Sequence, residues 1–88
     1  MAEYTLGKLS TKTNTPLHIL KYWIEQNYLE PHAMRKLKNG VDSYVFTDKN
    51  VDDVSKVKAL KKAGFSLGAA WLALERNPEA VDKLLNAL

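Results

Sequence analysis

The sequence contains no cysteine, few glycines and prolines, and no long apolar run. Without cysteine the chain can form neither a disulfide framework nor a thiolate metal site, and thiol catalysis is excluded. No run is long or apolar enough to span a membrane, and the opening residues, MAEYTLGKLS, lack the apolar core of a signal peptide. These absences favour a soluble, cytoplasmic protein.

The length and charge of the chain limit the alternatives further. A chain of 88 residues predicts a single domain spanning residues 1–88. The formal net charge is +3, which decides little by itself, so the placement of the charges matters more. Three cations gather beside Asn39-Gly40, namely Arg35, Lys36 and Lys38.

The stretch from Asn14 to Pro31 predicts a short helix with two different faces. Thr15 is suited to cap its start, Pro16 to the first helical position, and Asn27 to the left-handed conformation that ends a helix. The apolar residues at helical spacing predict an inner face of Leu17, Leu20 and Ile24. The polar residues at the same spacing predict an outer face of His18, Lys21, Tyr22 and Glu25.

A helix over residues 4–13, capped by Thr5, precedes this stretch across a brief turn, which predicts a helix-turn-helix. Beyond it, Asn39-Gly40 is a strong hairpin-turn signal, because both residues tolerate positive φ. We expect Met34 and Leu37 on one strand and residues 43–46 on the returning strand. A two-stranded ribbon in this place is a wing.

Three further helices are expected. Thr47 is suited to cap a third helix that ends at Gly64, Ser66 to cap a fourth, and Asn77-Pro78 to begin the last. The last helix carries an apolar stripe of Val81, Leu84, Leu85 and Leu88. The predicted fold is therefore mainly α, a winged helix-turn-helix of about four to five short helices with a two-stranded β-hairpin.

Taken together, these motifs resemble the winged-helix domain of MerR-type transcriptional regulators. The similarity lies in YTLGKLSTKTNTPLHILKYWIEQNYLEP, in Tyr44-Val45-Phe46-Thr47 with Asn50-Val51, and in Ala63-Gly64-Phe65-Ser66-Leu67. It covers roughly residues 4–74. The resemblance implies a sequence-specific protein that binds double-stranded DNA and controls transcription.

The chain departs from the family pattern at several positions. Lys21 and His18 stand where arginine is common, and lysine is a point charge without the planar fork of arginine. The wing arginine after the turn is absent. After Asn77 only about eleven residues follow, roughly 16 Å of helix, so we expect neither the family's long dimerisation arm nor an effector domain in this chain.

The resemblance also implies which residues contact DNA. On the second helix these are Thr15, His18, Lys21 and Tyr22, and on the wing they are Arg35, Lys36, Lys38 and Asn39. Tyr4 and Thr5 open the first helix, whose free N–H groups can hold a phosphate. Thr5 can equally serve as a plain cap.

Other chemistry is poorly represented in the sequence. His18 and His32 lie far apart without a third ligand, which disfavours a metal site, and no catalytic triad, phosphate loop or paired carboxylate is recognisable. We therefore expect no enzyme and no cofactor. Trp23, Phe46, Phe65 and Trp71 are expected in the core.

Two alternative functions stay open. The first is a recombination directionality or DNA-packaging factor of a phage or plasmid, built on the same fold. The second is a protein-interaction module. The stripe of Val81, Leu84, Leu85 and Leu88 could fold back on the domain, pair with another copy as a homodimer, or bind a protein partner.

Overall fold

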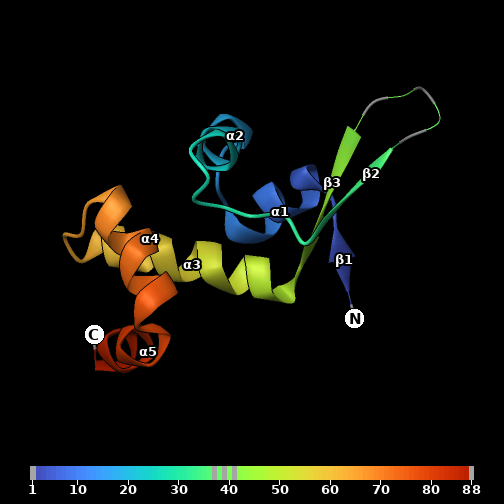
Figure 1. The fold of residues 1–88 in the computed structure, drawn as a ribbon. Coiled ribbons are helices and arrows are strands. Elements are labelled where there is room, and N and C mark those ends of the chain that lie inside the picture. The colour runs from blue at the N-terminus through green and yellow to red at the C-terminus, as the bar shows by residue number, and fades with distance from the viewer. Residues whose placement is uncertain (1, 37, 39, 41, 88) are drawn as a thin grey trace. The chain divides into compact units, whose positions relative to one another are not determined.

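The computed structural model describes residues 2–36, 38, 40 and 42–87. These residues form five helices and a three-stranded antiparallel sheet (Figure 1). In chain order the elements are β1 (Glu3–Tyr4), α1 (Leu6–Thr13), α2 (Leu17–Glu25), β2 (Ala33–Lys36), β3 (Asp42–Thr47), α3 (Asp48–Lys62), α4 (Leu67–Arg76) and α5 (Pro78–Ala87). The chain divides into two compact units, Met1–Asp52 and Asp53–Leu88, and the boundary falls within α3. The mainly helical class and the hairpin are as predicted.

Helix α1 begins and ends with local signals that the sequence contains. The Thr5 hydroxyl accepts a hydrogen bond from the Lys8 backbone N–H at 3.2 Å, which confirms Thr5 as the cap. At the other end Asn14 has φ 52°, and the Thr15 N–H donates to the Ser10 carbonyl at 3.0 Å. This left-handed ending turns the chain sharply toward α2. Tyr4, expected in this helix, instead belongs to β1.

The start of α2 differs from the prediction, whereas its end agrees with it. Pro16 occupies the cap position with ψ 144°, and no side chain caps the helix. The Thr15 hydroxyl instead donates to the Thr13 carbonyl at 3.2 Å, so the expectation that Thr15 caps α2 is wrong. Asn27 has φ 62°, and the Tyr28 N–H donates to the Trp23 carbonyl at 2.9 Å, as in a Schellman ending.

The sheet is built around β3, which pairs with β1 on one side and β2 on the other. In the pairing with β2, Ala33 lies opposite Val45 and Arg35 lies opposite Ser43. In Figure 1 this hairpin protrudes beyond α1. The expected two-stranded wing is thus present, and β1 adds a third strand that the sequence did not suggest, because a strand of two residues carries no periodic pattern.

The apolar face of the helix-turn-helix forms the core of the first unit. The buried apolar residues of this unit are Leu9, Leu20, Trp23, Leu29, Val45 and Phe46. Burying one such side chain stabilises the fold by about 1.5–3 kcal/mol. Leu17 was expected on the inner face of α2, but its side chain is 44% exposed.

Asn50 fixes the beginning of α3 within the first unit. Its side-chain oxygen accepts from the Thr47 N–H at 3.0 Å, and its side-chain amide donates to the Glu30 carbonyl at 2.9 Å. Asn50 is 6% exposed, so these hydrogen bonds satisfy a buried polar group. They connect the segment that follows α2 to the end of β3.

The second unit consists of the rest of α3 with α4 and α5. Its buried apolar residues are Val54, Val57, Leu60, Ala70, Trp71, Leu74 and Val81. As predicted, Gly64 ends α3 with φ 109°, and the Ser66 hydroxyl caps α4 by accepting from the Ala69 N–H.

Helix α5 packs against the other helices of the second unit. Val81 is buried, and the Asp82 carboxylate pairs with the Lys56 ammonium of α3 at 2.6 Å. Leu84 is 38% exposed, and Leu88 lies outside the described residues. Of the predicted apolar stripe, Val81 therefore lies in the core of the second unit and Leu85 is half-buried.

Candidate nucleic-acid interface

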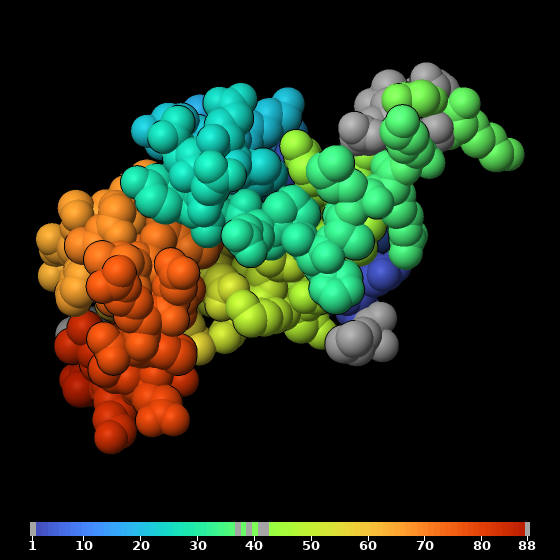
Figure 2. Space-filling model, in the orientation of Figure 1, coloured from blue at the N-terminus to red at the C-terminus, as the bar shows by residue number. Residues whose placement is uncertain are grey.

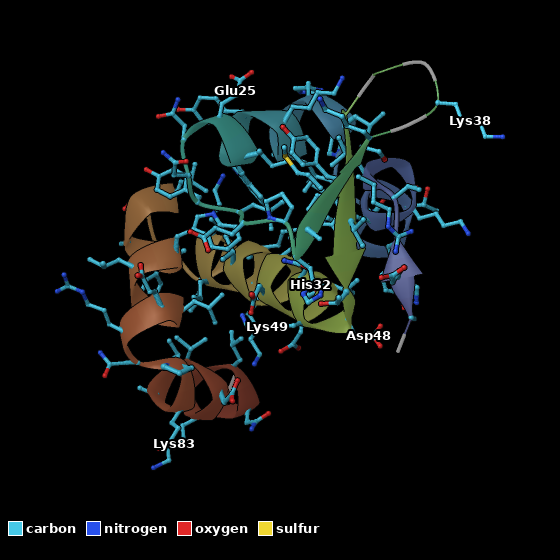
Figure 3. The ribbon with its side chains drawn as sticks, turned by 45° about the vertical axis from the view of Figure 1, so that its right-hand side comes forward. Glu25, His32, Lys38, Asp48, Lys49 and Lys83 are labelled. Carbon is cyan, nitrogen blue, oxygen red and sulfur yellow. The ribbon has the colours of Figure 1, made fainter. Side chains whose placement is uncertain are left out.

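Helix α2 presents a polar outer face to solvent. The side chains at helical spacing on this face, His18, Lys21, Tyr22 and Glu25, are all exposed, and Tyr22 is 49% exposed. Leu20 and Trp23 hold the opposite face in the core. Figure 3 shows the Glu25 side chain pointing outward from α2. The predicted outer face is therefore available for contact with a partner.

The hairpin carries a second set of exposed cations. Arg35 and Lys36 lie on β2, and both are exposed. Lys38 is exposed at the hairpin tip, and Figure 3 shows its side chain extending away from the protein. Asn39, predicted to take part in contact, lies outside the described residues. In the space-filling view, α2 and the hairpin are both exposed parts of the first unit (Figure 2).

Arg35 has an anionic partner that the sequence did not reveal. Its guanidinium donates to the Glu3 carboxylate of β1 at 2.7 Å. Both side chains lie on one face of the sheet, because Glu3 is opposite Thr47 and Arg35 is opposite Ser43, four residues away along β3. They remain 47% and 63% exposed. Glu3 therefore reduces the positive charge that Arg35 can offer to an anion.

The start of α1 is occupied by interactions within the protein. The Thr5 hydroxyl already accepts from the Lys8 N–H. The Tyr4 hydroxyl donates to the Asp48 carboxylate at 2.6 Å, and the Lys12 ammonium lies 5.1 Å from the centre of the Tyr4 ring. The hydrogen bond to Asp48 raises the pKa of Tyr4, and the charge of the same carboxylate acts in the same direction. A carboxylate in this place opposes the binding of a phosphate, although Lys12 partly offsets it.

The structure removes Thr15 from the candidate surface. Only 4% of this residue is exposed, and its hydroxyl is engaged with the Thr13 carbonyl. Its side chain cannot reach a ligand without local unfolding. The remaining predicted residues on α2 and on the hairpin are all exposed where the structure describes them.

A shallow groove of about 440 Å³ lies beside these elements. It is lined by Ile24, Asn27, Leu29, Glu30, Pro31, Ala33, Met34 and Tyr44, from the end of α2, the segment after it and the hairpin. Met34 is 59% exposed. The helix and the hairpin are thus separated by a mainly apolar depression that contains one acidic residue, Glu30.

Sequence reasoning missed two exposed residues of this region. Glu3 was missed because its partner Arg35 is 32 residues away and the strand that carries Glu3 is only two residues long. Leu17 was assigned to the core because a leucine at helical spacing usually marks the buried face. The sequence contained one signal that Leu17 could be exposed. Pro16 marks the start of the helix and Leu17 follows it directly, so the Leu17 side chain has no preceding helical turn to pack on.

A helix-turn-helix followed by a β-hairpin defines the class of winged helix-turn-helix proteins. The family model described as "MerR HTH family regulatory protein" matches residues 4–77 of this chain. The chain therefore belongs to the MerR family of helix-turn-helix regulatory proteins.

A solved structure supports the fold. The chain is similar to a transcriptional regulator of the MerR family from Bacillus cereus, with a TM-score of 0.73 and 16% sequence identity. The match covers 97% of this chain and 63% of that one, so this chain spans less than two thirds of the length of that regulator. No curated protein matches the sequence. None of the helices in the described part of the chain is both long and apolar enough to cross a membrane.

Proposed function

We propose that the first unit binds double-stranded DNA, with α2 in the major groove and the hairpin on the neighbouring backbone, and that the chain regulates transcription. One observation carries the proposal: two exposed elements of the same unit present cations, namely Lys21 on the outer face of α2 and Arg35, Lys36 and Lys38 on the hairpin. Membership of a family of helix-turn-helix regulatory proteins supports the same function.

The dimensions of α2 suit this role. Its nine residues correspond to about 13 Å of helix, and the major groove, about 12 Å wide, admits an α-helix. Lys21 and His18 can donate to the acceptors on the guanine edge, and the Glu25 carboxylate can accept from the cytosine amino group. Tyr22 can donate to a phosphate.

The hairpin supplies contacts of a different kind. Arg35, Lys36 and Lys38 can each neutralise a backbone phosphate, and each such contact releases counterions from the DNA. These contacts position the protein on the duplex but carry no sequence information. Reading of the bases therefore depends on α2.

Selection of bound duplexes from a random DNA pool tests the proposal, followed by affinity measurements over a range of salt concentrations. We expect an enriched sequence, and a log–log slope that falls in magnitude by about 0.9 for each phosphate contact removed. The Lys21→Ala/Arg35→Ala double variant should bind the enriched site at least severalfold more weakly. The matched control is Lys83→Ala/Arg76→Ala, which removes one lysine and one arginine from exposed positions in the second unit.

Three possible results would contradict parts of the proposal. Equal affinity of the two double variants would contradict the assignment of the contact surface. No enrichment from the pool would contradict DNA binding itself and would favour a protein-interaction module. Strong bending of the enriched site, measured with circularly permuted fragments, would favour the recombination or packaging role over a simple regulator.

A further inference from the structure

Leu17 is an apolar residue on the polar outer surface of α2. It is the first residue of the helix, and 44% of it is exposed. The core of the first unit takes Leu20 and Trp23 from the same helix, and both are almost completely buried. Leu17 is therefore only partly covered, in contrast to the residues of the packed face to which the sequence pattern assigned it.

The position of Leu17 on the helix connects it with the polar residues of the outer face. Lys21 follows Leu17 by four residues, so the two side chains lie one above the other on the same face. His18 is the next residue, and it is also exposed. Leu17, His18 and Lys21 thus form one continuous exposed patch over the first turns of α2. This is the end of a recognition helix that approaches base edges in helix-turn-helix complexes.

We infer that Leu17 is a specificity-determining residue that contacts the C5-methyl group of a thymine in the major groove. The inference rests on the proposed binding of DNA through α2. The thymine methyl is the apolar group of the major-groove edge, and it discriminates T·A from the other base pairs. Lys21 can recognise only hydrogen-bond acceptors there, and His18 recognises only groups that form hydrogen bonds, so Leu17 supplies the apolar part of the readout.

Exposure of one leucine is common on protein surfaces, and the chain offers a direct comparison. Leu72 of α4 is 47% exposed and has almost the same accessibility as Leu17. It lies in the second unit, outside the element proposed to enter the groove. Leu72 therefore serves as a control for any general effect of removing an exposed leucine.

Substitution of uracil for thymine tests the inference, because uracil keeps the base-pairing groups and lacks only the methyl. In the enriched duplex each thymine is replaced in turn, and the affinity is measured for the unaltered protein, Leu17→Ala and Leu72→Ala. We expect one or two positions at which uracil weakens binding of the unaltered protein about fourfold, which corresponds to burying one methyl-sized group at about 0.8 kcal/mol. Leu72→Ala should keep this difference, and Leu17→Ala should bind the thymine and uracil duplexes equally.

A second variant keeps the test decisive. Leu17→Met retains an apolar side chain and should retain the preference for thymine, and circular dichroism checks that each variant is folded. Equal binding of thymine and uracil duplexes by the unaltered protein at every position would overturn the inference, as would an enriched site without thymine or a Leu17→Ala variant that keeps the preference. Each of these results leaves DNA binding intact, whereas failure to enrich any duplex overturns the proposed function.

Discussion

Replacing Glu3 by glutamine should strengthen DNA binding, because on the proposed DNA surface Glu3 would compete with phosphate for the guanidinium of Arg35. The two side chains are joined at 2.7 Å, and both are about half exposed. A phosphate that approaches Arg35 meets the negative charge of Glu3 beside it. Glutamine keeps the size and the hydrogen-bonding oxygen of the side chain while removing the charge.

The exposure of the ion pair sets the size of the effect. The two side chains are 63% and 47% exposed, and ion pairs of this kind contribute about 0–1 kcal/mol. Release of Arg35 should therefore raise the affinity up to about fivefold at low salt. If Arg35 then neutralises one further phosphate, the log–log slope with salt should become steeper by about 0.9.

Fluorescence anisotropy with the enriched duplex at several salt concentrations measures both quantities. Glu79→Gln, in the first turn of α5, changes the net charge by the same amount in the second unit, so it controls for the overall charge. A double-variant cycle with Arg35→Ala isolates the mechanism. The reasoning is refuted if Glu3→Gln gains no more than Glu79→Gln, or if its gain persists in the Arg35→Ala background.

Three further predictions concern stability. Gly64→Ala should lower the free energy of unfolding by about 1–2 kcal/mol, because φ is 109° there. Gly7→Ala in α1, where an added Cβ would lie 3.9 Å from its nearest neighbour, should raise the free energy of unfolding by about 0.5–1 kcal/mol. Urea denaturation measures both changes, and changes of the same sign would contradict the reasoning. Asn50→Ala should lower the free energy of unfolding by about 2 kcal/mol, because it leaves the Thr47 N–H and the Glu30 carbonyl without their hydrogen-bond partner. A loss under about 0.5 kcal/mol in the same assay would contradict this and show that water replaces the Asn50 side chain. The pKa of Tyr4 is raised in the folded protein, which favours its neutral form. The stabilisation that the neutral hydroxyl gives to the folded state is therefore present below the ordinary tyrosine pKa of about 10 and is lost as pH rises through the raised pKa. Denaturation midpoints across alkaline pH should therefore fall further for the unaltered protein than for Tyr4→Phe, and parallel curves would contradict this.

The features that sequence predicted well are those whose cause is local. The left-handed endings at Asn27 and Gly64 and the caps at Thr5 and Ser66 each depend on a few neighbouring residues. A residue that tolerates positive φ, or a hydroxyl at a helix start, acts in the same way wherever it occurs. These signals placed the helix-turn-helix and the later helices in their correct order.

The failures have a non-local or competing cause. The ion pair of Glu3 with Arg35 depends on a strand that exists only through its pairing with β3. Thr15 has the right chemistry for a cap, but its hydroxyl bonds backward to the Thr13 carbonyl and Pro16 takes the cap position. Leu17 fits the apolar period of α2, yet the core of this unit is filled by other residues. The outcomes for Glu3 and Leu17 are decided by tertiary structure, which a periodic pattern does not contain, whereas the outcome for Thr15 is decided by a competing local hydrogen bond.

The composition of the proposed surface has a consequence for how it would discriminate between sequences. Among the described residues of α2 and the hairpin, Arg35 is the only arginine, and its guanidinium already pairs with the Glu3 carboxylate. Lys21 is a point charge without a bidentate fork. Under the proposed function, sequence-independent attraction to phosphates would therefore be moderate, which would lower affinity for all duplexes together. The difference in affinity between duplexes would then depend on the proposed base contacts of His18, Lys21 and Leu17, so loss of these contacts should reduce specificity more than loss of the hairpin cations.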